Sequence, residues 1–183
     1  MRKTVILALV AAVLAGPVRA ASKDETPKAP APTKEHDWLK QLEGTWETES
    51  EMVMEPGKPA VKSKGTETTR TLGGFWSVAE YKGDFMGKSF TGVMTVGYDA
   101  KKKKYVGTWV CSMCDTLWKY EGTVKGKVLT LHSEGPCPKT GKTVKMRDTI
   151  ELKDKDTKVL TGSVQTEDGK WVTFMTLTAK RKK

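Results

Sequence analysis

Hydrophobic and polar residues alternate with a period of two along most of the chain beyond residue 44. This alternation is typical of β-strands that bury one face. Turn residues interrupt it at 56–57, 73–74, 83–84, 99–102, 125–126, 136–141, 154–156 and 168–169. With a further break at 112–115, the pattern predicts about ten strands. No interval is long enough for the crossover helices of a parallel sheet. We therefore expect an all-β domain, an antiparallel up-and-down barrel, with a flattened sandwich as the competing architecture.

The alternation also predicts which side chains point into the barrel. In the first strand, Glu47, Glu49 and Glu51 are expected to face outward. The expected inward rows are Trp46, Thr48, Ser50 and Met52; Val61, Ser63, Gly65 and Glu67; Phe90, Gly92, Met94, Val96 and Tyr98; Trp118, Tyr120 and Val124; and Val144, Met146, Asp148, Ile150 and Leu152. These rows mix carboxylates and hydroxyls with aromatic residues and methionines. The mixture indicates an interior that holds a cavity rather than a wholly apolar core.

The N-terminal residues read as a targeting segment followed by a linker. Residues 1–20 have a charged start, an apolar stretch and a small-x-small cleavage site at Val18-Arg19-Ala20, the pattern of a secretory signal peptide. The apolar stretch is shorter than the roughly 20 residues of a membrane span, so no stable membrane anchor is expected. Residues 21–34 are rich in Pro, Ala and Lys and are predicted to be a disordered linker. We expect a periplasmic or secreted protein with one β-barrel domain at 35–183.

A short amphipathic segment joins the linker to the first strand. Trp38, Leu39 and Leu42 are its apolar residues, and we expect a short helix there that closes one end of the barrel. The segment continues into Gly44-Thr45-Trp46.

A Gly-x-Trp at the start of the first strand resembles calycin barrels, the lipocalins and their relatives. The resemblance implies that Trp46 packs across one end of the barrel, beneath a cation from the last strand, Lys180 or Arg181. Trp38, Gly44 and Trp46 are accordingly assigned to structural closure.

Longer motifs point to a particular family. They are Trp38-Leu39-Lys40-Gln41-Leu42-Glu43-Gly44-Thr45-Trp46, Met52-Val53-Met54-Glu55-Pro56-Gly57, Leu72-Gly73-Gly74-Phe75-Trp76, Met94-Thr95-Val96-Gly97-Tyr98-Asp99, Tyr105-Val106-Gly107-Thr108-Trp109, Tyr120-Glu121-Gly122-Thr123 and Asp168-Gly169-Lys170-Trp171. This set resembles the bacterial proteins grouped as domain of unknown function 1579. The family has no assigned activity, so the resemblance implies a calycin-like barrel and no reaction. The chain departs from the family at Cys111-Ser112-Met113-Cys114, where an acidic or small polar residue is expected near position 111.

Composition and charge add little to this interpretation. The chain has 183 residues, of which 37% are hydrophobic, enough for a single core. The formal net charge is +10, and loss of Arg2, Lys3 and Arg19 with the predicted signal would leave +7. Lysine clusters at 101–104 and 180–183 suit solvated loops and protected strand ends better than polyanion contacts. No motif indicates nucleic-acid binding, and the oligomeric state is not predicted.

The three cysteines are the most distinctive local feature. Cys111 and Cys114 form a Cys-x-x-Cys motif, and Cys137 lies between two prolines. A continuous strand would place residues three apart about 10 Å from each other, so a bond between Cys111 and Cys114 requires a turn there. Pairing of Cys137 with either partner is equally compatible with the sequence. We expect one stabilising disulfide and one free thiol.

A thiol-based metal or redox site is the alternative for these residues. Cys111, Cys114, Cys137 and His132 could supply ligands for zinc or copper(I), with Met113 as a further sulfur. A redox Cys-x-x-Cys normally starts a helix that lowers the thiol pKa, and no helix is predicted here. No cofactor is otherwise expected.

Catalytic residues are not assigned. The chain contains 2 histidines, and its serines lack the Gly-x-Ser-x-Gly context. Glu67 or Asp148 could act as an interior acid or base in a barrel enzyme, but a wall carboxylate that accepts hydrogen bonds is the simpler interpretation.

The leading hypothesis is therefore a binding module that holds a small apolar or amphipathic ligand in the barrel. Its candidate ligand-binding residues are Glu67, Met94, Tyr98, Trp118, Tyr120, Met146 and Asp148.

Overall fold

The computed structural model describes residues 30–55, 57–137 and 140–183. The predicted signal peptide at 1–20 and most of the predicted linker lie outside these residues. Ala31–Lys183 form one compact unit. Among the described residues, no helix has the length and apolarity to cross a membrane.

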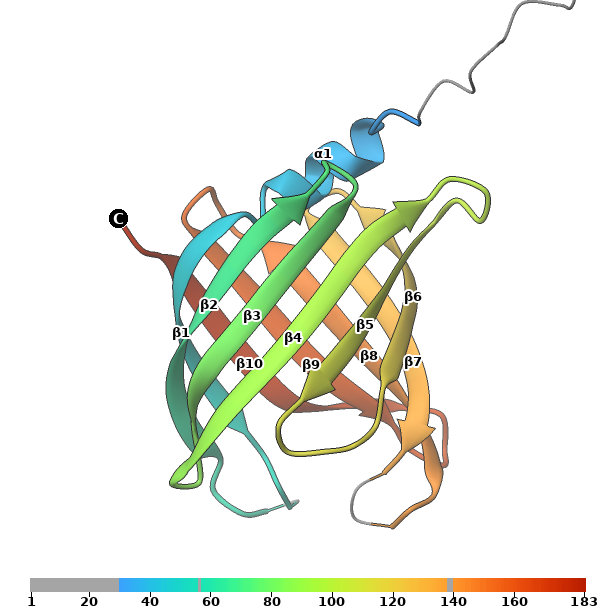
Figure 1. Cartoon of the computed structure of the whole chain (residues 1–183). Helices are drawn as coiled ribbons and strands as arrows, with labels where there is room; N and C mark the ends of the chain where they lie inside the picture. Colours follow the sequence, from blue (N-terminus) through green and yellow to red (C-terminus); the bar gives the residue numbers. More distant parts are fainter. Residues whose placement is uncertain (1–29, 56, 138–139) are drawn as a thin grey trace, which may run out of the picture. The chain divides into compact units, whose positions relative to one another are not determined.

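A short helix precedes ten strands that close into a barrel (Figure 1). The elements are α1 (Lys34–Lys40), β1 (Gly44–Met52), β2 (Val61–Leu72), β3 (Trp76–Phe85), β4 (Lys88–Asp99), β5 (Lys104–Cys111), β6 (Trp118–Lys125), β7 (Val128–Pro136), β8 (Thr143–Leu152), β9 (Thr157–Gln165) and β10 (Trp171–Arg181). Each strand pairs antiparallel with its neighbours in sequence, and β1 pairs with β10. The predicted antiparallel up-and-down barrel is confirmed, and the sandwich alternative is wrong.

One predicted turn is misplaced. The break expected at Gly83-Asp84 lies inside β3, where Gly83 pairs with Gly65 of β2. The chain turns instead at Met86 and Gly87, whose φ angles are 53° and 75°. Two consecutive residues with positive φ make the tight turn that matches the twist of two paired strands. Glycine thus marks a close approach of two strands at Gly83, not the end of one.

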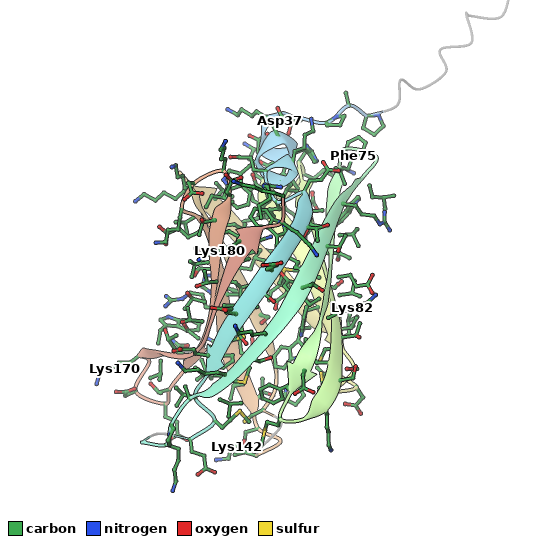
Figure 2. The ribbon with its side chains drawn as sticks, turned by 90° about the vertical axis from the view of Figure 1, so that its left-hand side faces the viewer. Asp37, Phe75, Lys82, Lys142, Lys170 and Lys180 are labelled. Atoms are coloured by element: carbon green, nitrogen blue, oxygen red, sulfur yellow. The ribbon has the colours of Figure 1, made fainter. Side chains whose placement is uncertain are left out.

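The two ends of the barrel differ (Figure 2). Helix α1 lies across one end, here called the helix end, where the labelled Asp37 and Phe75 are found. The opposite loop end carries the connections β1–β2, β3–β4, β5–β6, β7–β8 and β9–β10, with the labelled Lys142 and Lys170. Two hydrogen bonds attach α1 to the barrel: Trp38 Nε1 donates to the Gly126 carbonyl at 3.1 Å, and the Tyr105 hydroxyl donates to the Glu35 carbonyl at 2.9 Å. The helix end is therefore closed by specific contacts.

Trp46 is the centre of that closure. Its side chain is fully buried, and its Nε1 donates to the Leu42 carbonyl at 3.0 Å. Of the two candidate cations on β10, Arg181 is the one above the ring, at 4.0 Å from the ring centroid. Gly44 makes room for it, because a Cβ there would lie 2.4 Å from Arg181 Nη1. Gly44 also has φ of +128°, which L side chains rarely adopt.

Candidate functional site

The inward rows change in exposure along the barrel axis. In most strands the inward residues of the helix half are buried and those nearest the loop end are half-buried, although Thr71, Tyr98 and Val124 are half-buried at the helix end. In β1, Trp46 and Thr48 are buried, whereas Ser50 and Met52 are half-buried. A change from buried to half-buried toward the loop end also occurs in β2, β3, β4, β5, β7, β8, β9 and β10. In β6 the order is reversed, with Trp118 buried at the loop end and Val124 half-buried at the helix end. The inward side chains are therefore mostly buried in the helix half and partly exposed to solvent in the loop half.

The described residues of the helix half pack closely. A pocket of about 10 Å³ lies between Glu67, Met94 and Lys158, space for a single water molecule. Buried aliphatic and aromatic residues fill the rest of this half. They include Leu39, Leu42, Val96, Tyr105, Leu129, Leu131, Ile150, Leu152 and Leu160.

A buried ion pair crosses the helix half. Lys158 Nζ lies 2.5 Å from Glu67 Oε1, and these side chains are only 6% and 1% exposed. Thr69 also donates to Glu67, and Lys158 Nζ lies 4.3 Å from the Trp46 ring centroid. Burial lowers the pKa of Lys158, and the negative charge of Glu67 opposes that shift. Glu67 Oε1 is thus held by protein partners, whereas Glu67 Oε2 is buried with no hydrogen-bond partner among the described residues.

Aromatic rings line the loop half. The Trp109 ring lies across Gly92, where a Cβ would come within 2.2 Å of the ring. Tyr81 meets Trp109 edge-on with ring centroids 5.4 Å apart, and Phe90 lies 6.2 Å from it. Trp118 packs beside Gly135 on the next strands. Together these side chains make an apolar wall that is partly open to solvent.

Tyr120 and Asp148 are the polar pair at the boundary between the two halves. The Tyr120 hydroxyl donates to Asp148 Oδ2 at 2.5 Å. Burial raises the pKa of Asp148 to about 6, although the hydrogen bond from Tyr120 acts in the opposite direction. Burial and the Asp148 charge raise the pKa of Tyr120 well above its ordinary value, so Tyr120 stays a donor. The other carboxylate oxygen, Asp148 Oδ1, takes no part in this hydrogen bond.

Exposed apolar side chains are frequent at the loop end, among the lysines found there. Most of the large hydrophobic side chains that are exposed on the described surface belong to its connections or to the strand ends beside them. These residues are Val53, Met54, Met86, Val110, Met113, Leu117 and Val172.

The seven predicted ligand-binding residues thus fall into separate places. Trp118, Tyr120, Met146 and Asp148 face the loop half or its boundary. Glu67 and Met94 line the small pocket of the helix half. Tyr98 packs under α1, with ring centroids 5.9 Å from His36 and 5.2 Å from Tyr105.

The cysteine motif lies at the loop end. Cys111 ends β5, and its Sγ lies 3.4 Å from the Sγ of Cys114. Both residues are free thiols, so the expected disulfide is not present in this structure. Cys137 begins the β7–β8 connection at the same end. His132 lies on the outer face of β7 against Trp171, with ring centroids 5.8 Å apart. Among the described residues, no three His, Cys, Asp or Glu side chains are grouped as metal ligands.

A groove on the outer face of the barrel is a second candidate site. It has a volume of about 760 Å³ and crosses β4 to β8 between Trp76 and Trp171. Thr95, Val106 and Thr108 lie in it, and Lys102, Lys119 and Lys145 carry its positive charge. Arg147 stacks on Trp171 with its Cζ 4.6 Å from the ring centroid. Burial lowers the pKa of His132, and the charge of Arg147 adds to that effect.

Three important residues were absent from the predicted set. Lys158 is a lysine on an inward row, and its partner Glu67 is 91 residues away, so no local pattern indicates the pair. Phe90 was assigned to an inward row without a ligand role. Trp109 appeared only within a family motif, although its alternation with Tyr105 and Cys111 would have placed it inside the barrel.

The comparisons with known proteins agree with the fold. Residues 31–181 match the family described as "Protein of unknown function (DUF1579)". The crystal structure of Rv2717c from M. tuberculosis is 13% identical with a TM-score of 0.60, covering 84% of this chain and 100% of that one. The S-type phycobiliprotein lyase CPES from Guillardia theta is 11% identical with a TM-score of 0.56, covering 82% of this chain and 94% of that one. A comparison with curated proteins gave no match. Identities this low show similarity of fold alone.

Proposed function

The chain belongs to the family described as "Protein of unknown function (DUF1579)", and we propose that this member binds a small apolar or amphipathic ligand in the loop half of its barrel. One observation carries the proposal. In nine of the ten strands, inward side chains change from buried to half-buried toward the loop end. A barrel evolved only for stability would bury these aromatic residues and methionines completely.

The chemistry of the loop half indicates the class of ligand. Phe90, Trp109, Trp118 and Met146 offer a predominantly apolar surface, and Asp148 Oδ1 offers a single acceptor at its inner limit. Ligand sites commonly combine an apolar wall with a few polar groups that orient the ligand. The ligand that fits is a ring or chain with one hydroxyl or amine at its leading end. The exposed apolar side chains of the loop end form the entrance for this ligand.

The experiment is to look for a ligand that remains bound during purification. The chain would be produced in bacteria, purified without detergent and weighed by native mass spectrometry, and extracted compounds would be identified after denaturation. A bound compound of the stated class supports the proposal. Absence of a retained ligand, together with no saturable binding of fluorescent fatty-acid analogues or aromatic alcohols, would contradict it.

The outer groove is the competing location for the same function. Its volume of about 760 Å³ is within the range of small-molecule sites. Its rim is charged, with Lys119 and Lys145 beside Glu121 and Glu134, so it would suit a more polar ligand. Variants that add a bulky side chain to the barrel interior or to the outer groove, with ligand binding as the measurement, distinguish these two locations.

We also propose that the protein acts in the periplasm or outside the cell. The proposal rests on the signal-like pattern of residues 1–20. Fractionation of cells that express the full chain, with N-terminal sequencing of the product, tests it. A product that starts at Ala21 in the periplasm or medium is expected, and an uncleaved cytoplasmic product would contradict it.

A further inference from the structure

The β5–β6 connection begins with a turn that brings two thiols together. The Cys114 amide donates to the Cys111 carbonyl at 3.5 Å, a contact from residue i+3 to residue i. Such a turn keeps the two Cα atoms within about 7 Å, whereas a disulfide requires roughly 4.4–6.8 Å. The Sγ atoms are already 3.4 Å apart, and both side chains are half-buried. The turn that the cysteine spacing required is therefore present.

Hydrogen bonds to the neighbouring strand β4 also hold this turn in place. Ser112 N donates to the Thr91 carbonyl of β4 at 2.8 Å, and Thr91 N donates to Ser112 Oγ at 3.1 Å. These two bonds fix the residue next to Cys111. Closing an S–S bond of about 2.05 Å then needs a shift of little more than 1 Å between the sulfur atoms, which side-chain rotation can supply.

We propose that Cys111 and Cys114 are a site of reversible oxidative modification, a dithiol that exchanges with small-molecule or protein disulfides at the loop end. In the first step, one thiol loses its proton and attacks the incoming disulfide, which forms a mixed disulfide and releases one thiol. In the second, the other cysteine displaces the bound partner as a second thiol. The protein loses two electrons and two protons, and the incoming disulfide is reduced to two thiols.

The structure assigns the two steps to different cysteines. Cys111 ends a strand on an inward row, and burial raises the pKa of its thiol, which lowers the fraction present as the reactive thiolate. Cys114 lies in the connection beyond the strand. We assign the attack to Cys114 and the resolving step to Cys111. The dithiol proposal does not depend on ligand binding in the barrel, because it rests only on the turn that brings Cys111 and Cys114 together.

Thiol mapping tests the pairing on the unmodified chain. The reduced, folded protein would be equilibrated with mixtures of oxidised and reduced glutathione, quenched in acid, alkylated and mapped by mass spectrometry. The expected product is a link between Cys111 and Cys114, formed equally in the matched control C137S. A link that involves Cys137, or both thiols still alkylated in C137S after prolonged exposure to oxidised glutathione, would overturn the proposal.

Two single variants test the order of the steps. C111S should accumulate a glutathione adduct on Cys114, whereas C114S should form the adduct on Cys111 several-fold more slowly. Equal rates would overturn the assignment of the attacking thiol. Far-UV circular dichroism of each variant confirms that the barrel is intact before the rates are compared.

Discussion

The helix half and the loop half of the barrel are built from the same ten strands but use their interiors differently. In the helix half, Lys158 and Arg181 both lie over the Trp46 ring, and Glu67 Oε1 is paired with Lys158, although Glu67 Oε2 is buried without a hydrogen-bond partner among the described residues. In the loop half, Phe90 and Trp109 are half-buried, and Tyr120 donates to only one of the two Asp148 carboxylate oxygens. A buried charge inside a barrel therefore does not by itself indicate a ligand site. The difference in solvent exposure between the inward side chains of the two halves is what favours the loop half.

The largest expected effect comes from breaking the ion pair of the helix half. Lys158→Ala leaves Glu67 as an uncompensated buried charge, and removal of one partner of a buried pair typically costs about 3–5 kcal/mol. Urea denaturation at neutral pH measures the free energy of unfolding. Lys64→Ala is the matched control, because Lys64 pairs with Glu49 at 2.9 Å on the exposed surface. We expect no measurable change for that control, and equal losses in the two variants would contradict a structural role for the buried pair.

The second prediction concerns the pH dependence of Asp148. Its folded pKa of about 6 is above the ordinary value of 3.8, so the folded state holds the proton more tightly than the unfolded state. Its contribution to stability is fully present below pH 4 and is lost as the pH rises through 6. The loss reaches roughly 3 kcal/mol, since each pKa unit is worth about 1.4 kcal/mol.

Asp148→Asn removes this titration and retains an acceptor for Tyr120. The variant should match the original chain near pH 4 and exceed it in stability above pH 7, as measured by urea denaturation across that range. A stability difference that does not change with pH would show that Asp148 is not buried in the way described.

The third prediction tests the closure of the helix end. Arg181 stacks on Trp46 and donates from Nη2 to the Gln41 carbonyl at 3.2 Å. Arg181→Met should lower the unfolding free energy by about 2 kcal/mol, from the lost cation–π contact and charged hydrogen bonds. Lys180→Met, one residue away on the outward row, is the control and should stay within about 0.5 kcal/mol. A larger loss at Lys180 than at Arg181 would refute the closure.

The smallest effect belongs to the cysteine turn of the loop half. Oxidation of Cys111 and Cys114 closes a loop of only a few residues, so it should stabilise the barrel by no more than about 2 kcal/mol. Thermal denaturation of the oxidised and reduced protein measures this difference. A gain well beyond that limit would indicate that the turn is disordered in the reduced protein, contrary to its hydrogen bonds with Thr91.

The fold was predictable from sequence because period-two alternation and turn residues are local signals. The same signals placed Tyr120 and Asp148 on inward rows. They did not show that these two side chains meet, because that contact depends on the register of β6, β7 and β8. Lys158 and Glu67 meet only after the barrel closes through β1 and β10. The outer groove likewise depends on side chains from many strands.

The most direct test of the account is ligand binding by two tryptophan variants. Val164→Trp adds bulk to the inward row of β9, where Val164 pairs with Met146, and Val106→Trp adds the same bulk to the outer groove. Titration with a fluorescent fatty-acid analogue, followed by its emission, measures the Kd of each. The account predicts saturable binding by the unmodified chain, at least a roughly tenfold weaker Kd for Val164→Trp, about 1.4 kcal/mol, and an unchanged Kd for Val106→Trp. Unchanged binding by Val164→Trp together with loss of binding by Val106→Trp would move the site to the outer groove and contradict the central claim.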